Sequence, residues 1–265
     1  MISIIIPTWN RKQCVMNAIN SILNQTTRLE TQLDYEIIVI DDGSTDNIRA
    51  LFKKEISNVK YIRYDENKGV NFARNKGVFY SRGDRIIFLD SDDTLTPDAF
   101  EIIKDYTKVT SAEVIFFGTA KKNGMKMYNL SHHGYFPYKD VLQGKKINGE
   151  FLGMYSRKVF DKYKFDESLF CFEAFFVYKV IKEYSVFTVD KICRLYSFEQ
   201  KNRITNDLAK LKNADKRYKD YKKYIKTFGW DYLKYMLFIQ FAKIVAKTVY
   251  YRYMLEVKRW QKKRK

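Results

Sequence analysis

Short runs of β-branched and other apolar residues alternate with longer segments in which apolar residues recur at helical spacing. The runs predict buried strands at residues 2–6, 36–40, 59–64, 85–89 and 113–117. The segments between them predict helices at about residues 11–25, 46–54 and 71–80, and one more that Pro97 opens. Strands that alternate with helices predict a parallel-rich α/β sheet with helices on both faces.

The composition of the chain changes after these elements. Residues 121–143 are polar and predict a loop or short strands, whereas Lys and Tyr dominate at helical spacing after about residue 204. We therefore expect two parts, a first domain at residues 1–204, with halves at 1–100 and 101–204, and a helical tail at 205–265.

Most of the formal net charge of +18 lies in this tail, where residues 206–265 hold eighteen Lys and Arg against five Asp and Glu. Such an excess favours an anionic membrane, nucleic acid or solubility alone, and no helix-turn-helix or RNA-recognition signature supports nucleic acid. Residues 231–260 predict one helix whose lysines interrupt the apolar residues, which suits a helix lying at a membrane interface. The alternative is a helix that packs on the first domain or on another subunit.

Several classes of protein are disfavoured by what the sequence lacks. The three cysteines are far apart and form no CxxC pair, so we expect neither a disulfide framework nor a cysteine metal site, and a reducing cytosol fits. His132 and His133 are the only histidines, and adjacent residues do not suit a Ser-His-Asp triad or a His-rich metal site. The opening apolar run is too short for a signal peptide, and no uninterrupted apolar stretch of about eighteen residues predicts a spanning helix.

Polar clusters follow three of the predicted strands, at Pro7-Thr8, Asp41-Asp42 and Asp90-Ser91-Asp92-Asp93. Ligands bind beyond the carboxyl ends of strands in sheets of this kind, so we expect the clusters to converge on one site. Closely spaced carboxylates need a compensating cation, and Mg²⁺ combines one or two carboxylates with phosphates and water. The alternative for the last cluster is that Asp93 or Thr94 caps the helix that follows.

Two further segments offer groups for a nucleotide. The carboxylates of Asp41-Asp42 could accept hydrogen bonds from a uracil or a ribose while Gly43 lets the backbone approach closely, although an Asx turn explains the same residues. The segment Asn67-Lys68-Gly69 and the nearby Arg74 offer amides and cations that suit a diphosphate, although a solvated loop explains them too.

Together these segments resemble the GT-A glycosyltransferases of family 2. The resemblance rests on ordered motifs over about the first hundred residues, namely Pro7-Thr8-Trp9-Asn10, the stretch from Ser21 to Thr26, Val39-Ile40-Asp41-Asp42-Gly43-Ser44-Thr45-Asp46, Asn67-Lys68-Gly69 with Ala73-Arg74-Asn75, and Phe88-Leu89-Asp90-Ser91-Asp92-Asp93. Any one motif is common, but the ordered set is specific. The resemblance implies a GT-A fold, a Rossmann-like nucleotide-binding mixed sheet flanked by helices, here with a C-terminal helical extension.

The resemblance also implies roles for the residues of these motifs. Pro7, Thr8 and Asp42 would line the nucleoside pocket, and Asp90 and Asp92 would hold the ribose, diphosphate and a Mn²⁺ or Mg²⁺ ion, with Asp92 the direct ligand. The residues expected to bind the nucleotide-sugar are Pro7, Thr8, Asn10, Asp41, Asp42, Asn67, Gly69, Arg74, Asp90, Ser91 and Asp92.

The resemblance also implies that a carboxylate in the second half of the domain acts as the base. Glu173 stands in the corresponding place. Ala174 departs from the commoner Glu-Asp pair, which leaves open a partly changed site or an inactive nucleotide-sugar-binding protein. An acidic residue favoured in a first helical turn is the structural alternative for Glu173. Lys201 and Arg203 are the cations available where the family often has a loop near the donor phosphates.

The resemblance therefore implies a metal-dependent, inverting glycosyltransferase of cell-surface polysaccharide synthesis. The expected donor is a nucleotide-sugar, with UDP favoured, and the expected acceptor is a glycan or a lipid-linked oligosaccharide. We expect a cytoplasmic enzyme, peripheral on the inner face of the membrane through an anionic surface, with no nucleic-acid partner. Alternatively, the C-terminal helices could join copies of the chain into a homo-oligomer.

Overall fold

Strand β1 (Ile2–Thr8) forms the centre of a parallel group of strands, because its apolar residues alternate between two buried faces. Ile4 and Ile6 pack on one side of the sheet and Ile5 packs on the other, and all three side chains are fully buried. A strand buried on both faces is mostly apolar, and the run from Ile2 to Ile6, which Ser3 alone interrupts, is the pattern that predicted it.

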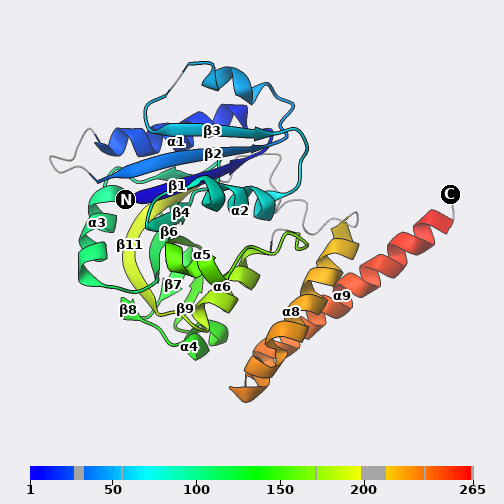
Figure 1. Ribbon diagram of the computed structural model, residues 1–265. Coiled ribbons are helices and arrows are strands. Elements are labelled where there is room, and N and C mark those ends of the chain that lie inside the picture. The colour runs from blue at the N-terminus through cyan, green and yellow to red at the C-terminus, as the bar shows by residue number, and fades with distance from the viewer. Residues whose placement is uncertain (27–32, 55, 171, 198–212, 236, 264–265) are drawn as a thin grey trace. The chain divides into compact units, whose positions relative to one another are not determined.

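The computed structural model describes residues 1–26, 33–54, 56–170, 172–197, 213–235 and 237–263 (Figure 1). The chain divides into two compact units, of which the first holds residues 1–166 and 176–198 and the second holds residues 167–175 and 199–265. The expected boundary at residues 204–205 lies outside the described residues, so it stays a prediction.

The first unit is built on a mixed sheet of nine strands among the described residues, in the order β3-β2-β1-β4-β10-β6-β11-β5, with β8 paired to β11. Beside β1, these strands are β2 (Tyr35–Asp42), β3 (Val59–Tyr64), β4 (Arg85–Phe88), β5 (Thr94–Leu95), β6 (Val114–Lys121), β8 (Gly134–Tyr135), β10 (Phe151–Ser156) and β11 (Val186–Tyr196). Strands β3, β2, β1 and β4 are parallel, and β10 runs antiparallel between β4 and β6. Strands β7 (Tyr128–Leu130) and β9 (Ile147–Gly149) form a separate pair.

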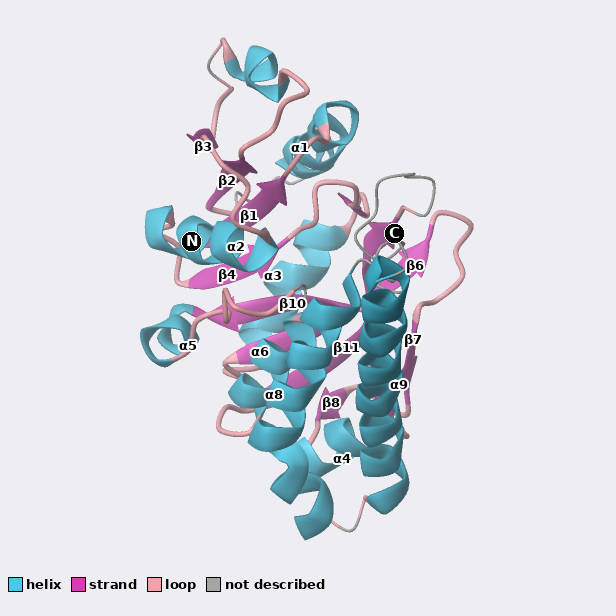
Figure 2. Ribbon diagram, turned by 90° about the vertical axis from the view of Figure 1, so that its right-hand side faces the viewer, coloured by secondary structure: helices cyan, strands magenta, loops and turns pink. Residues whose placement is uncertain are grey.

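Helices cover both faces of this sheet. They are α1 (Lys12–Thr26), the 3-10 helix η1 (Ile48–Phe52), α2 (Val70–Tyr80), α3 (Ala99–Val109), α4 (Tyr138–Gln143), α5 (Arg157–Lys162) and α6 (Glu173–Ile181), whose first turn belongs to the second unit. Figure 2 shows α1 and α2 on opposite sides of β1 and β2, where α1 packs with the side of Ile4 and α2 with the side of Ile5. The strands and helices predicted in the first unit are confirmed except at residues 46–54, where only the short η1 forms.

The second unit contains a hairpin of two helices, α8 (Ala214–Lys234) and α9 (Phe238–Lys263) (Figures 1 and 2). The helices are antiparallel, since Tyr221 stacks on Tyr251 at 5.6 Å between ring centroids and Lys258 Nζ lies 3.6 Å from Asp215 Oδ1. The prediction of one helix over residues 231–260 is therefore wrong. Tyr232 packs against Phe241 across the break, so burying apolar surface within the hairpin favours a turn over a continuous helix. None of the described helices is long and apolar enough to cross a membrane.

Candidate active site

The carboxyl ends of β2, β1 and β4 lie next to one another at one edge of the sheet. Thr8 is aligned with Asp41 in the parallel pairing of β1 and β2, and Ile5 is aligned with Phe88 in the pairing of β1 and β4. The Leu89 N–H donates to the carbonyl of Ile5 at 3.0 Å, which continues the pairing up to Asp90. The predicted convergence of the three polar clusters is confirmed by this register.

Asp41 is fully enclosed at this edge, and its carboxylate organises the turn that follows β2. Oδ1 accepts the Ser44 N–H at 2.9 Å, and Oδ2 accepts hydrogen bonds from Arg63 Nη1 at 2.9 Å and from the Tyr61 hydroxyl. Burial, together with this carboxylate, raises the pKa of Tyr61, so the phenol stays a donor. Asp41 thus shapes the site from within the protein, and no sequence pattern indicated its two partners on β3, Tyr61 and Arg63.

Asp42 joins the end of β2 to the loop that opens α2. Its carboxylate accepts the backbone N–H groups of Lys68, at 3.0 Å, and of Gly69, at 2.6 Å. Burial raises the pKa of Asp42, and these two hydrogen bonds act in the opposite direction. The structure therefore brings the predicted Asp42 and Gly69 into direct contact.

Gly43 and Asn10 make the close approach of these loops feasible. Gly43 has a φ of +76°, and a Cβ there would lie 2.7 Å from the backbone nitrogen of Asn67, so only glycine fits. Asn10 has a φ of 52°, its N–H donates to Ser44 Oγ at 2.9 Å, and its Oδ1 accepts the Thr45 N–H at 2.7 Å. The ends of β1 and β2 are thus fixed to each other.

Thr8 lies at the same edge and carries a buried hydroxyl. Among the described residues, its Oγ1 has no hydrogen-bond partner. A buried hydroxyl without a partner costs free energy, so this atom is a ready contact for a bound polar group. Pro7 precedes it within β1 and is buried as well.

Each carboxylate of the proposed metal pair faces an arginine. Arg74 Nη2 lies 3.2 Å from Asp90 Oδ1, and Arg11 Nη1 lies 3.1 Å from Asp92 Oδ2. The Asp90 side chain is 41% exposed and that of Asp92 is 10% exposed, so Asp90 opens to solvent while Asp92 lies deeper. Arg74 was expected from the sequence. Arg11 was missed, although its place directly after Asn10 in the first motif was an available signal.

Asp93 turns away from this pair and into the protein. Its Oδ1 accepts the Ser197 N–H at 3.1 Å, and Arg194 Nε lies 3.7 Å from its Oδ2. Burial raises the pKa of Asp93 to about 7, although Arg194 acts to lower it. The helix-capping alternative for Asp93 and Thr94 is wrong, because the residue before α3 is Asp98 and it makes no side-chain capping bond. Ser91 is buried between the partly exposed Asp90 and the deeper Asp92.

The residues at the end of β4 fit a hard divalent cation. Asp90 and Asp92 offer carboxylate oxygens, and no group of three or more His, Cys, Asp or Glu suited to a metal is found within the described residues. Mg²⁺ matches this donor set, because it completes its coordination with phosphate oxygens and water. Two carboxylates therefore suffice only when a phosphate-bearing ligand shares the ion.

Glu173 begins α6 and is exposed, in the second unit, whereas Asp90 and Asp92 belong to the first. Its place in a first helical turn agrees with the structural alternative, and its role as a base stays a prediction. Asn67 is exposed beside Lys68. Lys201 and Arg203 lie outside the described residues.

Comparison with known proteins supports the family and the fold that the sequence motifs predicted. The family model for glycosyl transferase family 2 matches residues 3–183. A GalNAc(5)-diNAcBac-PP-undecaprenol beta-1,3-glucosyltransferase of Campylobacter jejuni is 29% identical over 229 residues, which cover 83% of this chain and 71% of that protein. The poly(ribitol-phosphate) beta-N-acetylglucosaminyltransferase TarP of Staphylococcus aureus is 30% identical over 169 residues, 62% of this chain and 51% of TarP. The chain thus matches about half the length of TarP.

Solved structures show the fold. S. aureus TarS 1-349 superposes with a TM-score of 0.67 at 17% identity, covering 98% of this chain and 91% of that one. TarS 1-349 in complex with UDP-GlcNAc gives a TM-score of 0.68 at 15% identity, covering 84% of this chain and 66% of that one. The predicted GT-A fold with a C-terminal helical extension is confirmed by this likeness.

Proposed function

This chain belongs to glycosyl transferase family 2, and we propose that it transfers a sugar from a UDP-sugar to a hydroxyl of a lipid-linked glycan, with inversion at the anomeric carbon. The observation that carries the proposal is the meeting of Thr8, Asp42 and the Asp90-Asp92 pair at one edge of the sheet. That edge is where open α/β sheets bind nucleotides.

The nucleoside would bind at the ends of β1 and β2. Pro7 supplies an apolar wall, and the Thr8 hydroxyl supplies a polar group that has no partner among the described residues. Asp41, Asp42 and Asn10 would act mainly by holding the loops around this pocket, since their oxygens already accept backbone N–H groups. The complex of TarS with UDP-GlcNAc supports UDP as the nucleotide.

The diphosphate would bind beside Asp90 and Asp92. Ser91 lies between them in the chain, and Arg74 pairs with Asp90. Asn67 and Gly69, in the loop before α2, would also contribute to this part of the site. These two carboxylates would hold a Mn²⁺ or Mg²⁺ ion, with Asp92 the direct ligand. Such an ion neutralises negative charge on a departing diphosphate. Arg11 pairs with Asp92 at 3.1 Å and Arg74 pairs with Asp90 at 3.2 Å, which would keep these carboxylates in place.

Glu173 would serve as the general base. The acceptor hydroxyl oxygen forms a bond to the anomeric carbon while the bond from that carbon to the diphosphate oxygen breaks. The hydroxyl proton passes to the Glu173 carboxylate, and the electron pair of the broken bond leaves with the nucleoside diphosphate. A single displacement of this kind inverts the anomeric centre. If Ala174 marks a changed site, the alternative is an inactive protein that only binds the nucleotide-sugar.

The acceptor would be presented at an anionic membrane, on the cytoplasmic face. The name of the Campylobacter relative specifies an undecaprenol-linked acceptor, which supports a lipid-linked substrate here. Residues 214–263 hold fourteen Lys and Arg against four Asp and Glu. Basic residues near an anionic leaflet each contribute about 1 kcal/mol.

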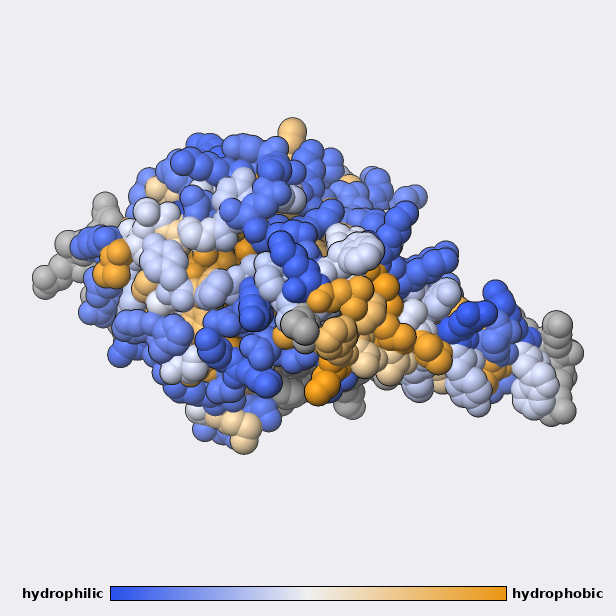
Figure 3. Space-filling view, turned by 90° about the horizontal axis from the view of Figure 1, so that it is seen from below, coloured by the Kyte–Doolittle hydropathy of each residue, from blue (hydrophilic) through white to orange (hydrophobic). Residues whose placement is uncertain are grey.

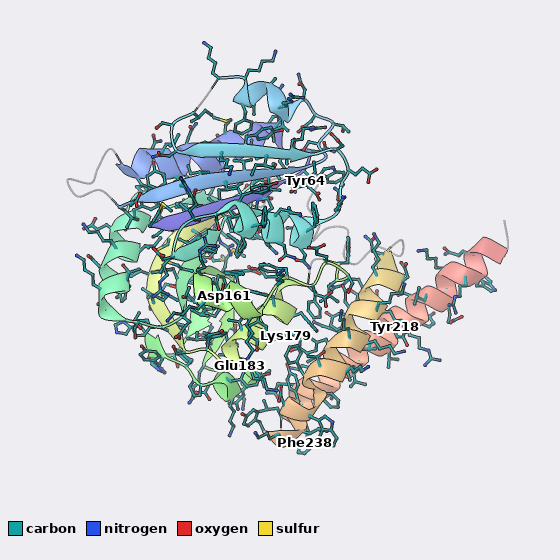
Figure 4. The ribbon with its side chains drawn as sticks, in the orientation of Figure 1. Tyr64, Asp161, Lys179, Glu183, Tyr218 and Phe238 are labelled. Atoms are coloured by element: carbon teal, nitrogen blue, oxygen red, sulfur yellow. The ribbon has the colours of Figure 1, made fainter. Side chains whose placement is uncertain are left out.

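The apolar contact with that membrane would be the turn end of the helical hairpin. Trp230 is 80% exposed and Ile239 is 72% exposed, and Leu233 and Phe238 are exposed beside them in the chain. Figure 4 shows Phe238 at the turn between α8 and α9, and Figure 3, which views the molecule from below, shows apolar side chains gathered on the hairpin. An exposed group of Trp, Phe and Ile that lies among lysines suits a membrane interface. A second copy of the chain is the other candidate for this surface.

The test of the proposed reaction is release of nucleoside diphosphate from a panel of nucleotide-sugars, with the full chain and Mn²⁺. Turnover with one UDP-sugar, increased by undecaprenol-linked glycans, is the expected result. Binding of UDP without any turnover across donors and acceptors would favour the inactive binding protein instead.

A further inference from the structure

The segment that carries Glu173 is built onto helix α8. Residues 167–175 group with the C-terminal helices in the second unit. The Phe172 ring packs against Tyr221 and Tyr224, at 5.4 and 5.3 Å between centroids, and the Phe175 ring packs edge-on against Phe228 at 5.4 Å. Aromatic contacts therefore bracket Glu173 on both sides in the chain.

A buried ion pair on α8 anchors the backbone of the same segment. Asp220 is 1% exposed and Arg217 is 6% exposed, and Arg217 Nη1 lies 3.4 Å from Asp220 Oδ2. Asp220 Oδ1 accepts the Phe170 N–H at 3.1 Å, and Arg217 Nη1 donates to the Phe170 carbonyl at 3.5 Å. The pair thus binds both backbone polar groups of one residue, three positions before Glu173.

The energetics of such a pair point to a positioning role. Removing two charges from water is costly, so a buried ion pair is weak evidence for added stability. The Arg217 guanidinium is held further by the Tyr221 hydroxyl, which accepts from Nη2 at 3.2 Å, and by the Tyr221 ring at 5.0 Å. These contacts hold the guanidinium that donates to the Phe170 carbonyl.

We infer that Arg217 and Asp220 are positioning residues that fix the Glu173 segment on α8 for proton transfer. The inference rests on the proposed function of Glu173 as the base. It gives helix α8 of the C-terminal hairpin a role in holding the proposed base. A small misplacement of a reacting group can cost about a hundredfold in rate, so the pair should affect kcat far more than donor binding.

The decisive variant is the double substitution Arg217→Met with Asp220→Leu in the full chain. Apolar residues of similar volume often replace a buried ion pair without loss of stability, so the Tm should change little. The kcat should fall at least about tenfold, while the KM for the UDP-sugar stays unchanged. The matched control is Tyr232→Phe, which removes the buried hydrogen bond of 2.8 Å between the Tyr224 and Tyr232 hydroxyls and leaves the bonds to Phe170 intact.

The same double substitution in a Glu173→Gln background distinguishes an effect through Glu173 from a loss of activity that is independent of Glu173. If the pair acts through Glu173, the loss in kcat should be absent once Glu173 is removed, because groups that act as a unit are not additive. An unchanged kcat in the folded double variant, or a full additive loss in the Glu173→Gln background, would overturn the inference. A Glu173→Gln protein with wild-type kcat would instead remove the base assignment itself.

If the double variant loses its cooperative unfolding transition, the single substitution Asp220→Asn tests the positioning role instead. It keeps the volume and an oxygen for the Phe170 N–H but removes the charge that orients Arg217. A severalfold loss of kcat at unchanged donor KM is expected for Asp220→Asn and not for Tyr232→Phe. Equal kcat values for these two variants would overturn the inference.

Discussion

Arg11 donates a hydrogen bond from Nη1 to Oδ2 of Asp92 at 3.1 Å, linking the loop between β1 and α1 to the cluster after β4. This arginine holds a deep carboxylate that is suited to a divalent cation. We predict that EDTA abolishes turnover, that Mn²⁺ or Mg²⁺ restores it, and that Asp92→Asn lowers kcat/KM at least about a hundredfold because it weakens a metal ligand. Steady-state kinetics and titration with UDP and Mn²⁺ measure both effects.

The matched control for Asp92→Asn is Asp190→Asn. Asp190 is a half-exposed carboxylate on β11 that also pairs with a cation, Lys126, at 2.7 Å, and it belongs to no proposed site. It should retain full activity. Turnover that persists unchanged in EDTA would exclude metal dependence.

Glu173→Gln should lower kcat by about 10²–10⁴, the usual contribution of a general base. UDP binding with Mn²⁺ should be retained, since none of the residues proposed for the nucleotide is altered. Single-turnover kinetics with a bound donor measure the loss. Glu167→Gln is the matched control, because it removes a nearby carboxylate of the same segment, and a greater loss there would move the role of base to Glu167.

Gly43→Ala should destabilise the turn after β2. The φ of +76° is strained for alanine, and the new Cβ would lie 2.7 Å from backbone atoms of Glu66 and Asn67. We expect the free energy of unfolding to fall by about 1–3 kcal/mol, with weaker UDP binding because the Asp42 loop must move. Chemical denaturation measures the first effect.

Gly124→Ala is a control for the φ alone, since its φ is +83° and nothing lies within 4 Å of its Cβ position. Equal losses for the two variants would show that the clash plays no part.

Stability should depend on Glu36 at acid pH. Burial acts to raise the pKa of Glu36, but hydrogen bonds from the Arg82 N–H and the Ser3 hydroxyl outweigh it and hold the pKa below its ordinary value near 4.5. A folded-state pKa below the unfolded one means that the ionised carboxylate stabilises the protein above pH 4.5 and loses that effect as the pH falls through the folded-state pKa. The advantage of wild type over Glu36→Gln in free energy of unfolding should therefore be constant near neutral pH and shrink in acid. Denaturation series from pH 3 to pH 7 test this, and parallel profiles would contradict it.

Trp230→Ala with Ile239→Ala should lower binding to phosphatidylserine vesicles at least about tenfold, because each large apolar side chain contributes about 1.5–3 kcal/mol when it leaves water. Flotation measures the bound fraction, which should also fall at high salt. Val249→Ala is the matched control, since Val249 is an exposed apolar residue of α9 away from the turn. A wild-type chain that does not float, but forms a dimer that the double variant disrupts, would assign this end of the hairpin to a subunit contact.

The sequence by itself determined the order of the elements and the edge of the sheet at which the site lies. Runs such as residues 37–40 are apolar at every position, which is typical of a strand buried on both faces. Parallel strands then bring their carboxyl ends together, so Thr8, Asp42 and Asp90 could be grouped without coordinates. Both conclusions depend only on the residue types within each segment and on the spacing of its apolar residues.

The tertiary structure decided what each polar side chain faces and which unit it belongs to. Asp41 and Asp93 read as members of acidic clusters, yet they are enclosed by Tyr61 and Ser197, far away in the chain. The helical spacing of the tail continues past Lys234 in the sequence, whereas the structure ends α8 there and begins α9 at Phe238. The attachment of Phe170 to Asp220 joins residues fifty positions apart. Contacts of this kind depend on how elements pack, and local sequence periodicity contains no record of them.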